Sequence, residues 1–143
     1  MSPTYDEIFA ASFERILGEG AYNPEFIGRF YELFFAASED VAKRFEHTDM
    51  SRQKTMLHDS LRTLVEFNQH RRLSPQMERL ALAHGPGAAA IPPRLYAVWL
   101  DALLATVREW DREFDTQVDL AWRLTMAPGI SYLQFGYEHP PRS

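Results

Sequence analysis

The sequence contains no cysteine among its 143 residues. Disulfide scaffolds, thiolate-bound zinc or iron–sulfur sites and cysteine nucleophiles are therefore excluded. Its five histidines remain as side chains that can bind a metal through an uncharged nitrogen. The nucleotide-binding motifs GxGxxG and GxxxxGK[ST], the zinc motif HExxH and alternating-acid calcium loops are also missing.

Positive charge is scarce as well. The formal net charge is −5, and the densest basic cluster is the short run His70–Arg72. A protein that binds a phosphate backbone needs a clustered basic face, so we expect no nucleic-acid partner. No charged leader precedes an apolar segment, and no apolar run approaches the length of a membrane span. We therefore expect a soluble, cytoplasmic protein with no membrane partner.

Glycine and proline are few, with seven and nine residues, whereas 45% of the chain is hydrophobic. This composition is typical of a globular protein and excludes low-complexity sequence. The length is that of one domain, residues 1–143, with a core from about 5 to 137 and a short tail at 138–143. It leaves no room for a flavin or nicotinamide domain.

The apolar residues recur at three- and four-residue steps, which predicts amphipathic helices. No segment alternates as a half-buried strand does, so the predicted fold is all-α, with six to eight helices. Three helix starts pair a capping side chain with a proline: Ser2–Pro3, Asn23–Pro24 and Ser74–Pro75. Thr4 and Glu7 add a capping-box pattern near the first of them.

After the helix that starts at Asn23–Pro24, five more helices are expected. They cover residues 38 to about 45, about 50 to 67, 75–84, 93 to about 111, and 116 to about 137. Pro128 is expected to kink the last helix. The run Gly85–Pro86–Gly87 is expected to end the helix at 75–84, because glycine accepts left-handed geometry.

His84 lies on the apolar stripe of the helix at 75–84, in line with Met77, Leu80 and Ala81. A neutral imidazole on a dry face can bind iron or zinc through one ring nitrogen while a second group holds the other. Taken alone, the residue is more ordinarily interpreted as a buried histidine satisfied by a backbone carbonyl.

Two further polar residues accompany His84. Gln53 begins the apolar stripe of the helix from about 50, with Leu57 one turn along the same face. Tyr31 follows Phe30 in the helix that starts at Asn23. Each alone is consistent with a solvated glutamine or a core tyrosine, but together they indicate a slot for a cofactor between facing helices.

With these residues the sequence resembles the globins over about residues 5–137. The resemblance is carried by five segments that fall in globin order: Phe30–Phe35, Lys43–Phe45, Arg52–Leu57, Leu80–His84 and Ala121–Trp122. It is closest to bacterial single-domain globins and the haem domains of flavohaemoglobins. The stripe Tyr96, Trp99, Leu103–Leu104 and the turn Ala127–Ile130 also resemble globin domains of the sensor type.

The resemblance implies haem b, iron protoporphyrin IX, as the cofactor, with His84 as the proximal ligand of the iron. Phe45 would pack on the haem, and Tyr31, Gln53 and Leu57 would line the distal pocket. Tyr96 would reach the proximal side. The remaining residues expected in the pocket are Leu61 and Leu80. Flavohaemoglobins add a glutamate on the last helix, and the only acid near that place is Glu138.

Other side chains compete for these roles. His58 lies five residues after Gln53, about 140° further around the helix, so we place it away from the iron. His47 lies in a loop and is expected to be solvated, and Met56 is expected to fill the core. Arg44, Arg52 and Lys54 are all candidates to meet the haem propionates, and the sequence does not rank them.

The function that follows from the resemblance is reversible binding of a diatomic gas (O2, NO or CO) at a pentacoordinate or weakly hexacoordinate iron. Nitric oxide dioxygenation would need an external reductase. The alternatives are a gas- or redox-sensing globin that acts through a partner protein, and a haem-free scaffold with the globin fold. Monomer and homodimer both stay open.

Overall fold

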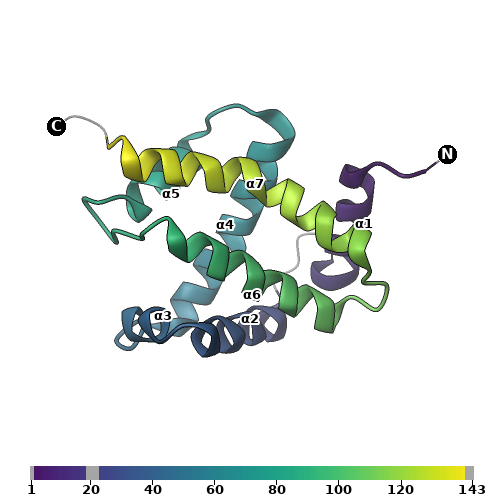
Figure 1. The fold of residues 1–143 in the computed structure, drawn as a ribbon, viewed down its shortest axis with the longest axis horizontal. Helices are drawn as coiled ribbons and strands as arrows, with labels where there is room; N and C mark the ends of the chain where they lie inside the picture. The colour runs from purple at the N-terminus through teal and green to yellow at the C-terminus, as the bar shows by residue number, and fades with distance from the viewer. Residues whose placement is uncertain (1, 19–22, 141–143) are drawn as a thin grey trace.

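The computed structural model describes residues 2–18 and 23–140. These residues form seven helices and no strand (Figure 1): α1 (Tyr5–Leu17), α2 (Pro24–Ala37), α3 (Glu39–Arg44), α4 (Met50–His70), α5 (Pro75–His84), α6 (Arg94–Trp110) and α7 (Thr116–Glu138). The predicted all-α class is confirmed. The end of the expected tail, residues 141–143, lies outside the described residues.

Most helix starts lie where the capping residues predict them. Asn23 and Ser74 cap α2 and α5, and a proline occupies the first turn of each. The start at Ser2–Pro3 is wrong, because Thr4 is the capping residue of α1. Its hydroxyl accepts from the Glu7 amide at 3.1 Å, and the Glu7 carboxylate accepts from the Thr4 amide at 3.3 Å. This reciprocal pair satisfies the Thr4 and Glu7 amides and fixes the start of α1 at Tyr5.

The segment between α5 and α6 differs from the prediction in one respect. Helix α5 ends at His84 as expected, but Gly85 has a φ of −78° and does not use the left-handed conformation. The left-handed residue of this segment is Ala90, with a φ of 51°. The Ala90 amide donates to the Gly85 carbonyl at 2.9 Å, which closes the turn and brings the chain back toward α6.

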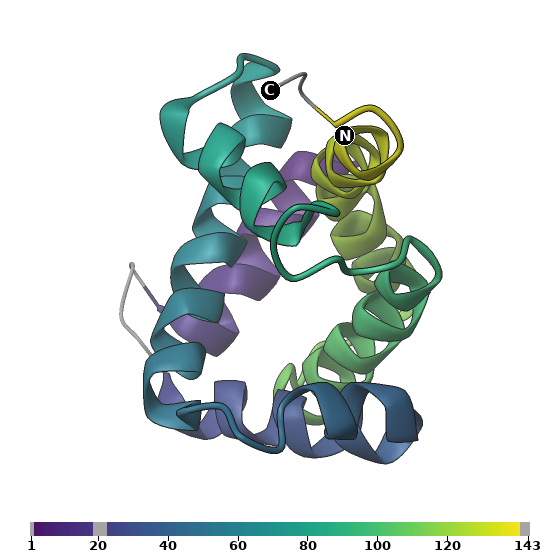
Figure 2. The ribbon, with the colours of Figure 1, turned by 90° about the vertical axis from the view of Figure 1, so that its left-hand side faces the viewer.

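The helices pack as a ring around the interior. Figure 2 shows α4 on one side, α6 with α7 on the other, α2 and α3 at the base and α5 near the top. Helix α7 packs against α1, α4 and α5, and α2 packs against α6. The largest fully buried side chains, Trp122, Phe26 and Phe30, come from α7 and α2. None of the described helices is long and apolar enough to span a membrane.

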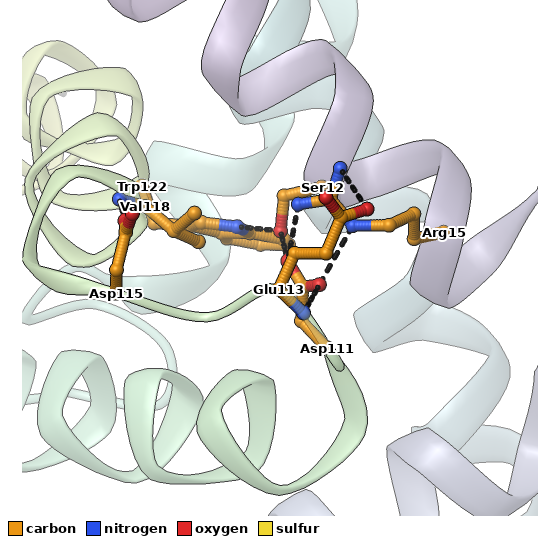
Figure 3. Close-up of polar contacts among 7 residues, drawn as sticks. All are labelled: Ser12, Arg15, Asp111, Glu113, Asp115, Val118 and Trp122. Carbon is orange, nitrogen blue, oxygen red and sulfur yellow. Dashed lines mark hydrogen bonds and ion pairs between the residues drawn. The ribbon is translucent and has the colours of Figure 1, made fainter.

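A buried polar cluster, which we call the Asp111 cluster, ties α1 to the corner between α6 and α7 (Figure 3). The Arg15 guanidinium donates to both carboxylate oxygens of Asp111, at 2.6 and 2.8 Å. The Ser12 hydroxyl donates to the same carboxylate at 2.6 Å and accepts from the Trp122 indole at 2.9 Å. The Glu113 amide adds a bond of 2.9 Å. The Asp111 carboxylate is fully buried. Its hydrogen bonds to Arg15, Ser12 and the Glu113 amide replace those that water would otherwise make.

Burial by itself would raise the pKa of the Asp111 carboxyl, but the hydrogen bonds from Arg15, Ser12 and the Glu113 amide outweigh it and lower that pKa. A carboxyl whose pKa is lower in the folded state stabilises the fold at pH values above its unfolded pKa of about 3.9. This contribution is lost as the pH falls through the folded-state pKa. The Asp111 cluster is therefore a stabilising contact that acid weakens.

Asp111→Asn is expected to lower the free energy of unfolding by about 1–3 kcal/mol at pH 7, because it removes charge-assisted bonds that are largely shielded from water. The difference from the unmodified protein should shrink below about pH 4. Urea denaturation between pH 3 and pH 7 measures both effects. The matched control is Asp119→Asn, whose partly exposed pair with Arg123 should contribute at most about 1 kcal/mol. Equal losses in the two variants would contradict the special role of Asp111.

Candidate functional site

The ring of helices encloses an apolar cavity. The space between its lining atoms, including the part that opens to solvent, is about 940 Å³. Helices α2 to α7 and the segment before α6 all contribute to its wall. The apolar lining residues include Phe34, Val41, Leu57, Leu64, Leu80, Ile91, Leu95, Trp99, Ile130 and Leu133. A mostly apolar wall with a few polar groups is typical of sites that hold a largely apolar small molecule.

His84, at the end of α5, is one of the few polar groups in this wall. Its Nδ1 lies 2.8 Å from the Leu80 carbonyl oxygen, which can only accept, so Nδ1 carries the proton. Burial lowers the pKa of the imidazole. The ring is therefore neutral at pH 7, and the lone pair is on Nε2. A neutral imidazole fixed by a backbone carbonyl is the usual form of a histidine that binds a metal.

Tyr96, from α6, lies beside His84, with ring centroids 6.4 Å apart. Its side chain is buried, and its hydroxyl has no hydrogen-bond partner among the residues that the structure describes. Burial raises the pKa of this phenol to about 12, so it stays protonated. A buried hydroxyl without a partner costs about 1–3 kcal/mol, and it borders the cavity. This hydroxyl is therefore a polar group at the cavity wall that the described residues leave unsatisfied.

Tyr31 and Gln53 form a second polar spot in the lining. The Gln53 amide nitrogen donates to the Tyr31 hydroxyl at 3.2 Å, which joins α2 to α4. Tyr31 is only 4% exposed. The aromatic ring of Phe45, just after α3, lies 5.9 Å from that of Tyr31 and lines the same cavity. The structure thus brings Tyr31, Gln53 and Phe45 together, as the resemblance implies.

Seven of the eight residues expected in the pocket line the cavity, and Leu61 does not. Leu61 is fully buried, but it points into the packed interior. At 100° per residue, Ser60 and Leu64 lie about 60° and 20° to one side of Leu57, whereas Leu61 lies about 40° to the other side. Leu61 therefore lies outside the lining of this cavity, and its expected role in the pocket stays a prediction. Leu64 and Ser60 are the lining residues that sequence reasoning missed, and the position of Gln53 on the same side was the signal that could have found them.

The competing histidines lie outside the lining of the cavity. His58 is buried on another side of α4, as its position around the helix predicts. His47 is exposed in the loop after α3, with its Nε2 3.5 Å from a Glu46 oxygen. Met56 does line the cavity, but it is half exposed and stands at the rim instead of filling the core. Glu138 is exposed at the end of α7 and is not part of the lining.

The structure also ranks the three basic residues that the sequence left open. Arg44 lines the cavity, whereas Arg52 and Lys54 do not. Its guanidinium donates to Asp40 at 3.3 Å and to the Ala90 carbonyl at 3.5 Å, both long bonds. Asp40 also accepts from Arg94 at 2.9 Å. The bond from Arg94, together with the charge of Arg44, lowers the pKa of Asp40. Two arginines thus share one carboxylate, so these three side chains together carry a net positive charge.

These observations define an all-helical protein built around an apolar cavity, whose wall holds a neutral histidine and a tyrosine–glutamine pair. No protein-family model matches the sequence, and no curated protein is similar to it. Among solved structures, the crystal structure of the Pseudomonas aeruginosa PAO1 protein PA3967 is similar, with 31% identity and a TM-score of 0.82. The match covers 94% of this chain and 98% of that one.

That protein is described as structurally highly homologous to a human hemoglobin. The chain belongs to the globin family.

Tyr96→Phe is expected to raise the free energy of unfolding of the protein without added ligand by about 1–2 kcal/mol, because it removes a buried hydroxyl that has no partner. Tyr31→Phe is the matched comparison. It removes a hydroxyl that is hydrogen-bonded to Gln53 and should lower the same quantity by about 1 kcal/mol. Chemical denaturation of both variants tests the contrast. Destabilisation by Tyr96→Phe would show that its hydroxyl has a partner in the ligand-free protein.

Proposed function

We propose that this chain is a haem-binding globin that reversibly binds oxygen or another diatomic gas, such as nitric oxide or carbon monoxide. The observation that carries the proposal is the state of His84. Its Nδ1 proton is held by the Leu80 carbonyl, so the lone pair of Nε2 is available in an apolar cavity. A single imidazole in a dry slot suits a metal that brings its other ligands with it, as the iron of a porphyrin does.

The residues around the cavity fit the haem group. Its aromatic and aliphatic walls suit the apolar disc of a porphyrin, whose burial favours binding. His84 would be the axial ligand, and Phe45, Leu57 and Leu80 would pack against the faces of the ring. Arg44, at the rim, would meet the carboxylates. Tyr96 offers a hydroxyl on the side of His84 that has no other partner.

When bound, haem supplies an iron atom with a coordination position at which a diatomic gas can bind. The chain provides the surroundings of that gas. The apolar walls exclude water, which strengthens every hydrogen bond formed inside. The Tyr31–Gln53 pair places polar hydrogens at an otherwise apolar wall, where they would stabilise a ligand that carries partial negative charge.

Beyond gas binding, we propose that the same site can support nitric oxide dioxygenation. That reaction consumes an electron, so the chain would need a reductase as a partner. Gas or redox sensing through a partner protein would use the same site. We propose gas binding first because reversible storage, dioxygenation and gas sensing all require it. We place the protein in the cytoplasm, as a monomer or homodimer, without a nucleic-acid or membrane partner.

The first test is absorption spectroscopy of the purified protein titrated with ferric haem. The unmodified chain should give a Soret band that shifts on reduction and again on exposure to carbon monoxide or oxygen. His84→Ala should remove the axial ligand and weaken or abolish this band. His47→Ala is the matched control, because that histidine is exposed in a loop, and its spectrum should be unchanged. An undiminished band in His84→Ala would overturn the ligand assignment.

Gln53→Leu is expected to speed the release of oxygen by about ten- to a hundredfold, because a hydrogen bond to a charged group contributes about 1.5–3 kcal/mol. Stopped-flow displacement of oxygen by carbon monoxide measures the release rate. The control is Gln69→Leu, which makes the same chemical change at an exposed position near the end of α4. Identical rates in all three proteins would remove the amide from the gas-binding side of the pocket.

A further inference from the structure

Helix α7 carries a buried glycine, Gly129, at its crossing with α4. A Cβ atom at this position would overlap Cδ2 of Leu64 and would lie 3.4 Å from its Cγ and 3.5 Å from its Cβ. The Leu64 side chain therefore occupies the space that any other residue at position 129 would fill. A side chain at position 129 would therefore require Leu64 to move.

Other glycines of the described chain do not share this property. A Cβ at Gly136, two turns further along α7, would lie 3.6 Å from the Ala81 Cβ, which is ordinary contact. A Cβ at Gly28 in α2 would lie 3.7 Å from the Lys54 ammonium nitrogen. Gly136 thus offers a matched comparison: it lies in the same helix, also against another helix, but without overlap.

Leu64 also connects Gly129 to the cavity. It is 3% exposed, and it lines the cavity together with Ile130 and Leu133 of α7. Leu64 Cδ2 fills the gap at Gly129, so Leu64 contacts α7 at this point and borders the cavity as well. Leu61 and Met126, which belong to the same two helices, are fully buried. If Leu64 were displaced, the cavity is the neighbouring space that could receive it, because packed cores have little free volume.

We propose that Gly129 determines how deep the cavity is at its α4–α7 end, by holding Leu64 back so that a large, rigid, apolar ligand can enter. Position 129 is therefore a size-determining position for this site, although its residue does not line the cavity itself. The identity of that ligand as haem rests on the proposed function above, whereas the dependence of cavity depth on Gly129 does not.

The test compares Gly129→Ala, Gly129→Ala/Leu64→Ala and Gly136→Ala. The first variant should push Leu64 into the cavity and weaken haem binding by about tenfold, since overpacking a filled space costs the equivalent of about five- to a hundredfold in affinity. The double variant removes the displaced methyl groups and should restore most of that loss. Gly136→Ala should bind haem as the unmodified protein does.

A second measurement does not depend on haem. The fluorescent probe 1-anilinonaphthalene-8-sulfonate, titrated into the haem-free proteins, should bind less tightly to Gly129→Ala and recover in the double variant. Thermal unfolding of the same haem-free samples checks that each variant is folded. Alanine favours a helix over glycine at both positions, so helix propensity cannot explain a loss seen at one of them alone.

The outcomes separate the two proposals. If haem binds to none of the proteins but the probe shows loss and rescue, the haem assignment fails and the role of Gly129 stands. If Gly129→Ala binds both molecules as tightly as the unmodified protein, or if removing Leu64 gives no rescue, the role of Gly129 is overturned. Equal losses in Gly129→Ala and Gly136→Ala would also overturn it.

Discussion

The structure depends on keeping an apolar cavity open at the centre of a small helical protein. Packed interiors close such spaces, because unfilled apolar volume costs free energy. The helices around this cavity are held by contacts that lie away from it. The Asp111 cluster fixes α1 against the corner of α6 and α7, and aromatic side chains pack α2 against α6. Within the lining, the bond between Gln53 and Tyr31 joins α4 to α2, so contacts outside the cavity and at its wall together hold the helices around it.

The polar groups around the cavity differ in how their hydrogen bonds are satisfied, and this difference decides which of their atoms remain available for a ligand. His84 is oriented by a backbone carbonyl that leaves one ring nitrogen available. Tyr31 and Gln53 are bonded to one another across two helices. The Tyr96 hydroxyl has no partner in the described part of the chain. If every buried polar group were satisfied by the protein itself, none would be available to hydrogen-bond a molecule in the cavity. The Tyr96 hydroxyl is such an available group.

Much of the fold follows from local signals. The caps at Thr4, Asn23 and Ser74 mark helix starts because a side-chain oxygen and a first-turn amide lie close together in sequence. The placement of His84 and Gln53 on apolar faces could also be read from helical periodicity. The periodicity did not separate Leu61 from Leu64, since both lie within about 40° of Leu57 and only the direction of the cavity decides between them. Nor did it show that Ala90, instead of a nearby glycine, takes the left-handed conformation.

The sequence by itself determined an all-helical domain without cysteine chemistry, and it identified the residue types of the site, because helix caps, amphipathic spacing and side-chain chemistry are local properties. Only the tertiary structure decided which of those residues share one space. It brought Tyr31, Gln53, Phe45 and His84 around the same cavity, and it selected Arg44 over Arg52 and Lys54 at the rim. It also revealed that Gly129 makes room for Leu64. These relations join residues far apart in the chain, and they are fixed by where helices cross, which no short stretch of sequence specifies.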